Sequence, residues 1–280
     1  MNRIDERFEA LRRAGQAAFI PFLTAGDPSL EVTRRAICAF ERAGADVIEL
    51  GFPFSDPIAD GPTIQASYTR ALGTGQRTED VFRMVEAARA EAKLPIVAMI
   101  SCSLVFRMGF DRFVDRAVAA GIDGATIPDL PVEEMEPLRA TADARDFRLI
   151  CFVTPATTDA RRAIAARLAR GFIYYISVRG ITGARADVPA DLAENIAKLR
   201  SETDVPVAVG FGISRPEHAR AVGRVADGVI VGSAIVARMH EAAGNPAEDP
   251  AEAGARFVAE MAAAARFGPA AGRRGRAAAN

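Results

Sequence analysis

The stretch AGADVI at residues 43–48 joins the end of a helical pattern to the start of an apolar run. A similar junction returns as AGIDGA at residues 120–125 and as VADGVI at residues 225–230. Each junction passes through an aspartate into a short run rich in β-forming residues. One helix-to-strand architecture therefore repeats along the chain.

Outward from these junctions, short β-rich runs alternate with segments whose apolar residues are three and four apart. Between the first two runs, Ser29 can begin a helix, Ala36 and Phe40 lie on one face, and Gly44 is placed to end it. The eight expected strands are residues 18–23, 46–50, 96–100, 124–127, 149–153, 172–177, 205–209 and 228–231.

Eight such units, with strands that lack a clear polar face, predict a parallel sheet covered by helices and closed as a (β/α)₈ barrel. A doubly wound open sheet is the alternative, but it normally has fewer strands, and no GxGxxG pattern follows the first run. We expect a single barrel domain over residues 1–267 and a flexible tail, rich in Gly, Ala and Arg, over residues 268–280.

Composition excludes several classes of function. With 50% hydrophobic and 25% charged residues the chain is globular, and a net charge of −1 argues against nucleic acid as a partner. Three cysteines without CxxC spacing indicate a reduced, cytoplasmic protein. The N-terminal residues are charged, and no apolar run approaches the ~20 residues of a membrane span, so we expect neither export nor insertion.

Two carboxylates are candidate catalytic groups, because reacting residues of such barrels follow the C-terminal ends of strands. Glu49 lies inside an apolar run, where an acid is costly unless it is paired or protonated. The alternative is a purely structural role for Glu49, in which an ion pair or a backbone contact satisfies its carboxylate. Asp60 follows in a loop whose prolines and glycine restrict the path of the backbone. The alternative is a purely structural role for Asp60, in an Asx turn. A partly desolvated Glu49 would give and take a proton near neutral pH.

Glycine-rich turns follow the sixth, seventh and eighth expected strands, at residues 180–183, 210–214 and 232–234. Backbone amides exposed by glycine, and the N-terminus of a helix that begins near Ser233, can hold a phosphate without a lysine. Three such turns in adjacent loops predict a small phosphorylated substrate.

Other catalytic groups are placed unfavourably. The two lysines, Lys93 and Lys198, lie before the third strand and in a helical pattern, so neither suits a Schiff base. The two histidines, His218 and His240, lie in helical patterns and cannot build a three-histidine zinc site, so no metal is expected. The chemistry then depends on carboxylates and on a tyrosine of the sixth strand, where alternation points one of two neighbouring tyrosines inward.

At this point the residues are recognisable. The stretches PFLTAGDP at residues 21–28 and ELGFPFSDPIADGPTIQ at residues 49–65 closely resemble the tryptophan synthase α chain. The resemblance continues through DLPVEE, GITG, GFGIS and GSAIV, which begin at residues 129, 180, 210 and 232. It covers roughly residues 4–267.

The resemblance implies retro-aldol cleavage of indole-3-glycerol phosphate to indole and glyceraldehyde 3-phosphate, a lyase reaction. Indole would pass to a tryptophan synthase β subunit within a 2α2β assembly, and only that partner would carry a cofactor, pyridoxal phosphate. By the same resemblance, Glu49 is the general acid and base at indole C3, and Asp60 stabilises charge at the indole NH. The implied substrate-binding residues are Phe22, Ile100, Ile127, Tyr174, Thr182, Gly183, Phe211, Gly212, Gly232 and Ser233.

The family also suggests that residues 178–189 close over substrate, that Asp129 orients the active-site loops, and that Pro53, Asp56 and Pro57 face the β subunit. One departure lies after the third strand. There the family commonly has a tyrosine and then an asparagine, and this chain has SCSL at residues 101–104.

Three alternatives remain beside the synthase subunit. A stand-alone lyase would release free indole, and activity without a partner would identify it. A non-catalytic allosteric subunit would not need both Glu49 and Asp60. Another phosphosugar enzyme, such as an epimerase, would keep only the barrel and the phosphate site.

Overall fold

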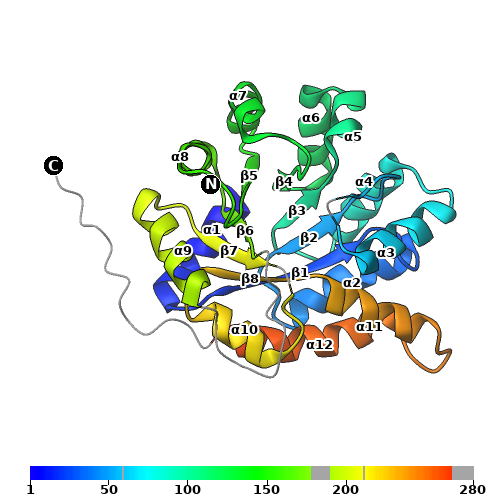
Figure 1. Cartoon of the computed structure of the whole chain (residues 1–280). Coiled ribbons are helices and arrows are strands. Elements are labelled where there is room, and N and C mark those ends of the chain that lie inside the picture. Colours follow the sequence, from blue (N-terminus) through cyan, green and yellow to red (C-terminus); the bar gives the residue numbers. More distant parts are fainter. Residues whose placement is uncertain (59, 178–189, 211, 267–280) are drawn as a thin grey trace.

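The eight strands form one closed parallel sheet. The computed structural model describes residues 1–58, 60–177, 190–210 and 212–266. Its strands pair in chain order, and the last strand, β8 (Gly228–Val231), pairs with the first, β1 (Ala18–Thr24). Helices surround the sheet (Figure 1). The predicted (β/α)₈ barrel is confirmed, and closure excludes the open sheet.

The remaining strands are short and lie within two residues of the predicted ranges. One difference has a simple cause: β7 begins at Val207 rather than at residue 205, because Pro206 has no amide hydrogen to donate to a neighbouring strand. The strands are β2 (Ile48–Gly51), β3 (Ile96–Met99), β4 (Gly124–Thr126), β5 (Arg148–Val153), β6 (Ile173–Ile176) and β7 (Val207–Gly210).

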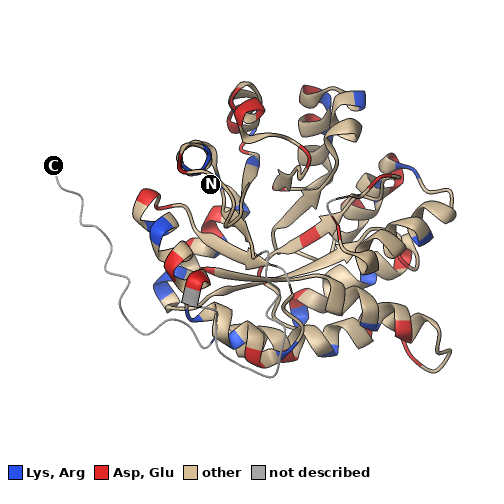
Figure 2. Ribbon diagram, in the orientation of Figure 1, with Lys and Arg blue, Asp and Glu red and all other residues tan. Residues whose placement is uncertain are grey.

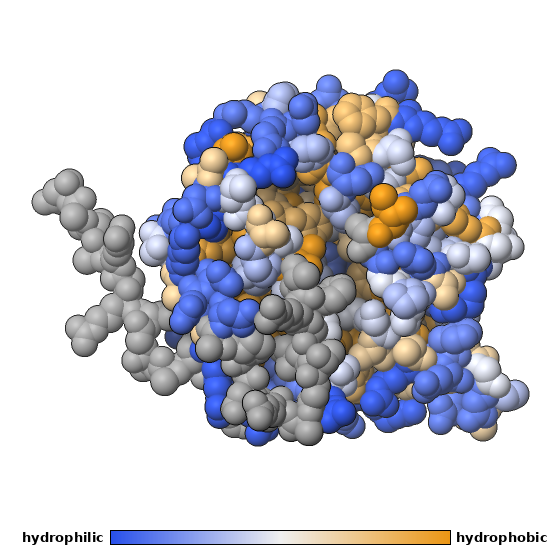
Figure 3. All heavy atoms as spheres, in the orientation of Figure 1, coloured by the Kyte–Doolittle hydropathy of each residue, from blue (hydrophilic) through white to orange (hydrophobic). Residues whose placement is uncertain are grey.

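The helices connect successive strands and cover the outside of the sheet, where Figure 3 shows a mainly hydrophilic periphery. Within the described residues, none of them has the length and apolar character needed to span a lipid bilayer. They are α1 (Arg3–Ala14), α2 (Leu30–Arg42), α3 (Pro62–Gly73), α4 (Thr78–Ala88), α5 (Cys102–Met108), α6 (Phe110–Ala120), α7 (Met135–Ala144), α8 (Asp159–Leu168), α9 (Ala190–Glu202), α10 (Pro216–Gly223), α11 (Ser233–Ala243) and α12 (Pro250–Ala265). A 3₁₀ turn, η1 (Val132–Glu134), precedes α7.

Helix α2 shows how local sequence sets these elements. The Ser29 hydroxyl accepts a hydrogen bond from the Val32 amide at its start, as predicted for an N-cap. Phe40 is fully buried on its inner face, and the chain turns at Gly44, whose φ of +98° suits glycine. The predicted first βα unit is confirmed.

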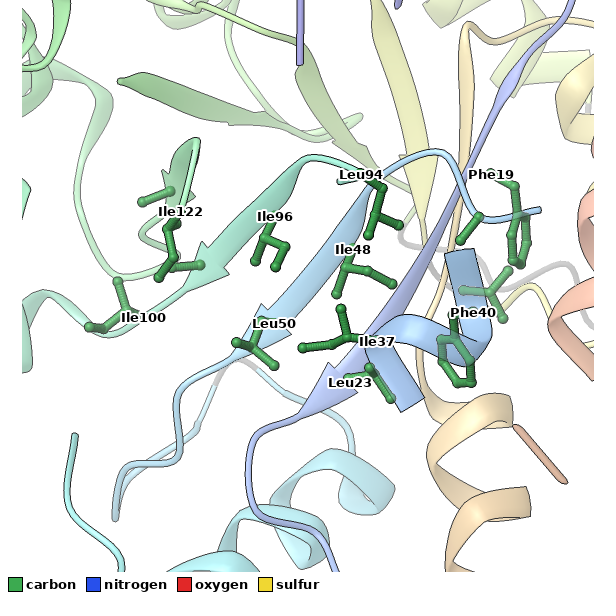
Figure 4. Close-up of a cluster of buried hydrophobic side chains, with 14 of the residues drawn as sticks. Phe19, Leu23, Ile37, Phe40, Ile48, Leu50, Leu94, Ile96, Ile100 and Ile122 are labelled. Atoms are coloured by element: carbon green, nitrogen blue, oxygen red, sulfur yellow. The ribbon is translucent and has the colours of Figure 1, made fainter. Parts of the chain in front are cut away.

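The strands are buried on both faces, so apolar side chains form two layers, one between the sheet and the helices and one inside the barrel. Between sheet and helices, Ile37 and Phe40 of α2 pack with Phe19 and Ile48 of the strands (Figure 4). Full burial of each such side chain contributes roughly 1.5–3 kcal/mol. A second cluster fills the barrel interior, where Phe8 of α1 closes the N-terminal end.

The aspartates of the three similar junctions share one structural role at the N-terminal end of the barrel. Each carboxylate accepts a hydrogen bond from a backbone amide at the start of the preceding strand, which fixes neighbouring strands in register. The pairs are Phe19 N to Asp46 at 2.8 Å, Ile96 N to Asp123 at 2.8 Å and Val207 N to Asp227 at 2.9 Å. The recurrence seen in the sequence thus has a physical cause.

Replacement of Asp123 by alanine tests this role. Asp123 is buried and pairs with Arg89 at 3.0 Å, and the Arg89 side chain is only 13% exposed. Removal of the carboxylate leaves a buried guanidinium with only backbone carbonyls as acceptors, so we expect the free energy of unfolding to fall by about 3 kcal/mol, the lower end for a broken buried ion pair. Urea denaturation measures it. Asp123→Asn, which keeps an acceptor oxygen, should lose less, and an alanine variant as stable as the wild type would contradict the role.

Candidate active site

A pocket opens at the C-terminal end of the barrel, where the strands end. Its volume is about 400 Å³, within the range of small-molecule sites. Residues from all eight strands, or from the segments that follow them, line it, and they fall into two carboxylates, an apolar wall and a glycine- and serine-rich rim. The lining residues are Phe22, Glu49, Asp60, Gly61, Pro62, Ile64, Met99, Pro128, Phe152, Tyr174, Ile176, Gly212, Ile213, Ser214, Ile230, Gly232, Ser233 and Ala234.

Glu49 lies in β2 with its carboxyl group in the barrel interior, 1% exposed. Figure 2 shows that most charged residues lie on helices and loops rather than in the sheet. The pKa of Glu49 is raised to about 8, chiefly by burial; a hydrogen bond from the Thr126 hydroxyl at 3.3 Å opposes the rise, and the nearby Asp60 charge adds to it. No arginine or lysine of the described residues pairs with Glu49. The acid is therefore protonated at neutral pH, as its position inside an apolar strand predicts.

Asp60 reaches the same pocket from the loop between β2 and α3. A side chain of α3 holds the loop: the Gln65 side-chain amide donates to the carbonyls of Pro57 and Asp60 at 3.2 and 2.8 Å. Pro62 then begins α3. Within the described chain, no group donates a hydrogen bond to the Asp60 carboxylate, so an Asx turn does not explain this residue. Burial raises the pKa of Asp60 to about 6, so the group is mostly ionised at neutral pH.

Phe22 and Tyr174 form part of the apolar wall, as expected. Strand alternation places Tyr174 inside the barrel and Tyr175 in the helix-facing cluster, and the Tyr174 ring lies 5.0 Å from that of Phe152. Met99, Pro128, Phe152, Ile176 and Ile230 complete the wall.

Ile100 and Ile127, two predicted wall residues, do not line this pocket. Both are buried in the cluster between the sheet and the helices, where Figure 4 shows Ile100 near Ile122. Their neighbours Met99 and Pro128 line the pocket instead. Successive strand residues point to opposite faces, so a shift of one position changes which side chain meets a ligand. Val97 is the registered partner of Glu49, whose side chain enters the pocket. Alternation along β3 therefore places Met99, two residues further on, on the same inner face.

The rim contains Gly212, Gly232 and Ser233, three of the predicted phosphate-binding residues. Gly212 has a φ of +74°, which requires glycine at this turn. Gly232 precedes α11, whose first backbone hydrogen bonds run from Ile235 and Val236 to the Gly232 carbonyl. The amides of Ser233 and Ala234 come before these bonds, at the positive end of the helix dipole, and suit an anion.

The predicted residues Thr182, Gly183 and Phe211 lie outside the described residues, as does the proposed closing segment at residues 178–189. Asp129, which the family resemblance implies in the orientation of the active-site loops, lies within the described residues. Asp129 accepts a hydrogen bond from the Cys102 amide at 2.7 Å, which ties the loop after β4 to the start of α5.

Lys198 lies in α9, His218 in α10 and His240 in α11, so none of them is on the pocket wall. Lys93 lies before β3, at the opposite end of the barrel. The described part of the chain contains no cluster of three or more His, Cys, Asp or Glu residues suited to a metal ion.

Together these groups form a largely apolar pocket that contains an acid able to donate a proton, an ionised carboxylate and a rim whose backbone amides suit an anion. Such an arrangement fits an aromatic, phosphorylated substrate and general acid–base chemistry.

Comparisons with known proteins agree with this description of the site. The family model described as "Tryptophan synthase alpha chain" matches residues 8–266. The chain is 48% identical over 242 residues to the tryptophan synthase alpha chain of Synechococcus elongatus, covering 86% of this chain and 91% of that one. It is 47% identical over 246 residues to that of Rhodopirellula baltica, covering 86% and 88%. The crystal structure of the Legionella pneumophila alpha chain aligns with a TM-score of 0.86 at 34% identity, covering 95% of this chain and 97% of that one.

Replacement of Glu49 by glutamine tests the protonation state. In the unfolded chain Glu49 has its ordinary pKa of 4.5 and is ionised at higher pH, whereas in the folded chain its pKa is about 8. The folded state therefore binds more protons between these values, and stability falls as pH rises through that window. Glu49→Gln removes the penalty, so thermal unfolding at pH 8 should show a gain on the order of a few kcal/mol that disappears near pH 4.5. A gain of equal size at both pH values would contradict it.

Proposed function

Since the chain belongs to the tryptophan synthase alpha chain family, we propose that it cleaves indole-3-glycerol phosphate to indole and glyceraldehyde 3-phosphate by a retro-aldol reaction. It is then the lyase subunit of an enzyme of tryptophan biosynthesis. The observation that carries the proposal is the pair of carboxyl groups with different protonation states, Glu49 and Asp60, in one apolar pocket.

The bond between indole C3 and the glycerol chain breaks only when C3 becomes tetrahedral. Glu49, protonated at neutral pH, gives its proton to C3, and positive charge develops on the indole nitrogen. Asp60, ionised at the same pH, stabilises that charge through the indole N–H. The electrons of the breaking bond then restore the aromatic ring. Glu49, now a carboxylate, takes the proton of the glycerol hydroxyl as the aldehyde forms, which returns the acid to its starting state.

The apolar wall would hold the indole ring, with Phe22 and Tyr174 beside it, and would exclude water that would compete for the proton. The rim at Gly212, Gly232 and Ser233 would bind the phosphate through backbone amides and the α11 dipole. For Thr182, Gly183 and Phe211 the assignment rests on the family motifs alone.

We also propose that the chain passes indole to a β subunit in a 2α2β assembly. The reaction above needs no cofactor on this chain, and pyridoxal phosphate belongs to the partner. The loop that carries Pro53, Asp56 and Pro57 also presents Ile58, whose side chain is 92% exposed. Its exposure leaves it free to contact another protein chain. The free thiols Cys38, Cys102 and Cys151 fit a cytoplasmic enzyme.

Indole release from indole-3-glycerol phosphate by the purified chain tests the proposal, with and without a tryptophan synthase β subunit. We expect slow release that rises sharply with the partner and that falls by at least about 100-fold in Glu49→Gln, the loss of a general acid. Fast release that ignores the partner would favour the stand-alone lyase. No release under either condition would contradict the proposed reaction.

A further inference from the structure

Tyr68, on the inner face of α3, is buried but its hydroxyl group has no hydrogen-bond partner among the described residues. Its ring packs with side chains of the pocket wall. A buried hydroxyl without a partner costs free energy, and such groups in folded proteins call for an explanation. The mechanism proposed above makes no use of this group. The apolar neighbours are Phe22 of β1, Phe54 of the β2–α3 loop, Ile64 of α3, Met99 of β3 and Val236 of α11.

The backbone of Gly51 fixes where the hydroxyl lies. A Cβ atom at Gly51 would lie 2.6 Å from the Tyr68 oxygen, so that oxygen occupies the space of a side chain at position 51. Residues two apart in a strand point to the same face, so this space is on the Glu49 side of β2, one step nearer the mouth of the barrel. The loop that carries Asp60 begins there.

The titratable groups that face the hydroxyl are Asp60 and Glu49, since the other elements packed against it present apolar side chains. Burial raises the pKa of Tyr68 well above its ordinary value, and the charges of Asp60 and Glu49 add to the rise. The group is therefore a hydrogen-bond donor at every working pH. Glu49 is neutral at pH 7 and already accepts from Thr126, whereas Asp60 is ionised and accepts from no described residue.

We propose that the Tyr68 hydroxyl is a positioning group, which donates a hydrogen bond to the Asp60 carboxylate when substrate fills the pocket and aims that carboxylate at the indole nitrogen. The inference rests on the proposed function and deepens it. A hydroxyl-to-carboxylate bond in an apolar site is short and strong, and it stabilises the ionised form that the reaction uses. It also supplies the partner that the buried hydroxyl lacks.

The test is Tyr68→Phe, which removes one oxygen atom and keeps the ring. We expect kcat for indole release to fall by about 10- to 100-fold with little change in KM, the effect of one hydrogen bond to a charged group. The Asp60 ionisation on the acid side of the kcat profile should lie at higher pH in the variant than in the wild type, because Asp60 loses a donor to its charged form. The melting temperature should not fall, because the lost hydroxyl has no described partner.

Two controls separate this role from a structural one. Tyr175→Phe removes a hydroxyl from a buried tyrosine on the helix-facing side of β6 and should leave kcat and the pH profile unchanged. In the Asp60→Ala background, which has no side-chain acceptor, addition of Tyr68→Phe should cause no further loss of kcat, because Tyr68 acts through Asp60.

A Tyr68→Phe variant with the wild-type kcat and pH profile would overturn the inference while the proposed function stands. A full further loss in the Asp60→Ala background would also overturn it, since Tyr68 would then act without Asp60. If the wild type releases no indole, the proposed function fails first and the inference fails with it.

Discussion

The burial of one carboxyl group, that of Glu49, is the constraint on which the active site depends. Water does not solvate a side chain buried inside a closed barrel, and an ionised acid is costly there. Glu49 therefore keeps its proton at neutral pH. Asp60, half-buried on a loop, ionises first. Two carboxyl groups of similar intrinsic acidity thus take different roles because their surroundings differ.

The two ends of the barrel divide the tasks. At the N-terminal end, Asp46, Asp123 and Asp227 bind strand amides and fix neighbouring strands. At the C-terminal end, the strands present Glu49 and the loops present Asp60 and the rim of α11. Rigid strand ends let loops vary without loss of the fold, which is why barrels of this kind place chemistry at that end.

The sequence alone predicted the barrel, because apolar runs, helix caps and the repeated aspartate junction all agree along the chain. It also placed Glu49 and Asp60 at the pocket. The family resemblance implies Ile100 and Ile127 as wall residues, whereas their neighbours Met99 and Pro128 line the pocket, because adjacent strand residues face opposite sides. Tyr68 was not singled out, because its spacing from Ile64 and Ala71 is that of an ordinary core residue. Its unpaired hydroxyl is visible only in three dimensions.

The central claim is that Glu49 is a protonated acid at neutral pH, and infrared difference spectroscopy measures this directly. Subtraction of the Glu49→Gln spectrum from that of the wild type at pH 7 should reveal the carbonyl stretch of a protonated carboxylic acid. That band should disappear as the pH rises through about 8. A difference spectrum that shows only a carboxylate at pH 7 would contradict the account, because Glu49 would then have no proton to give to the substrate.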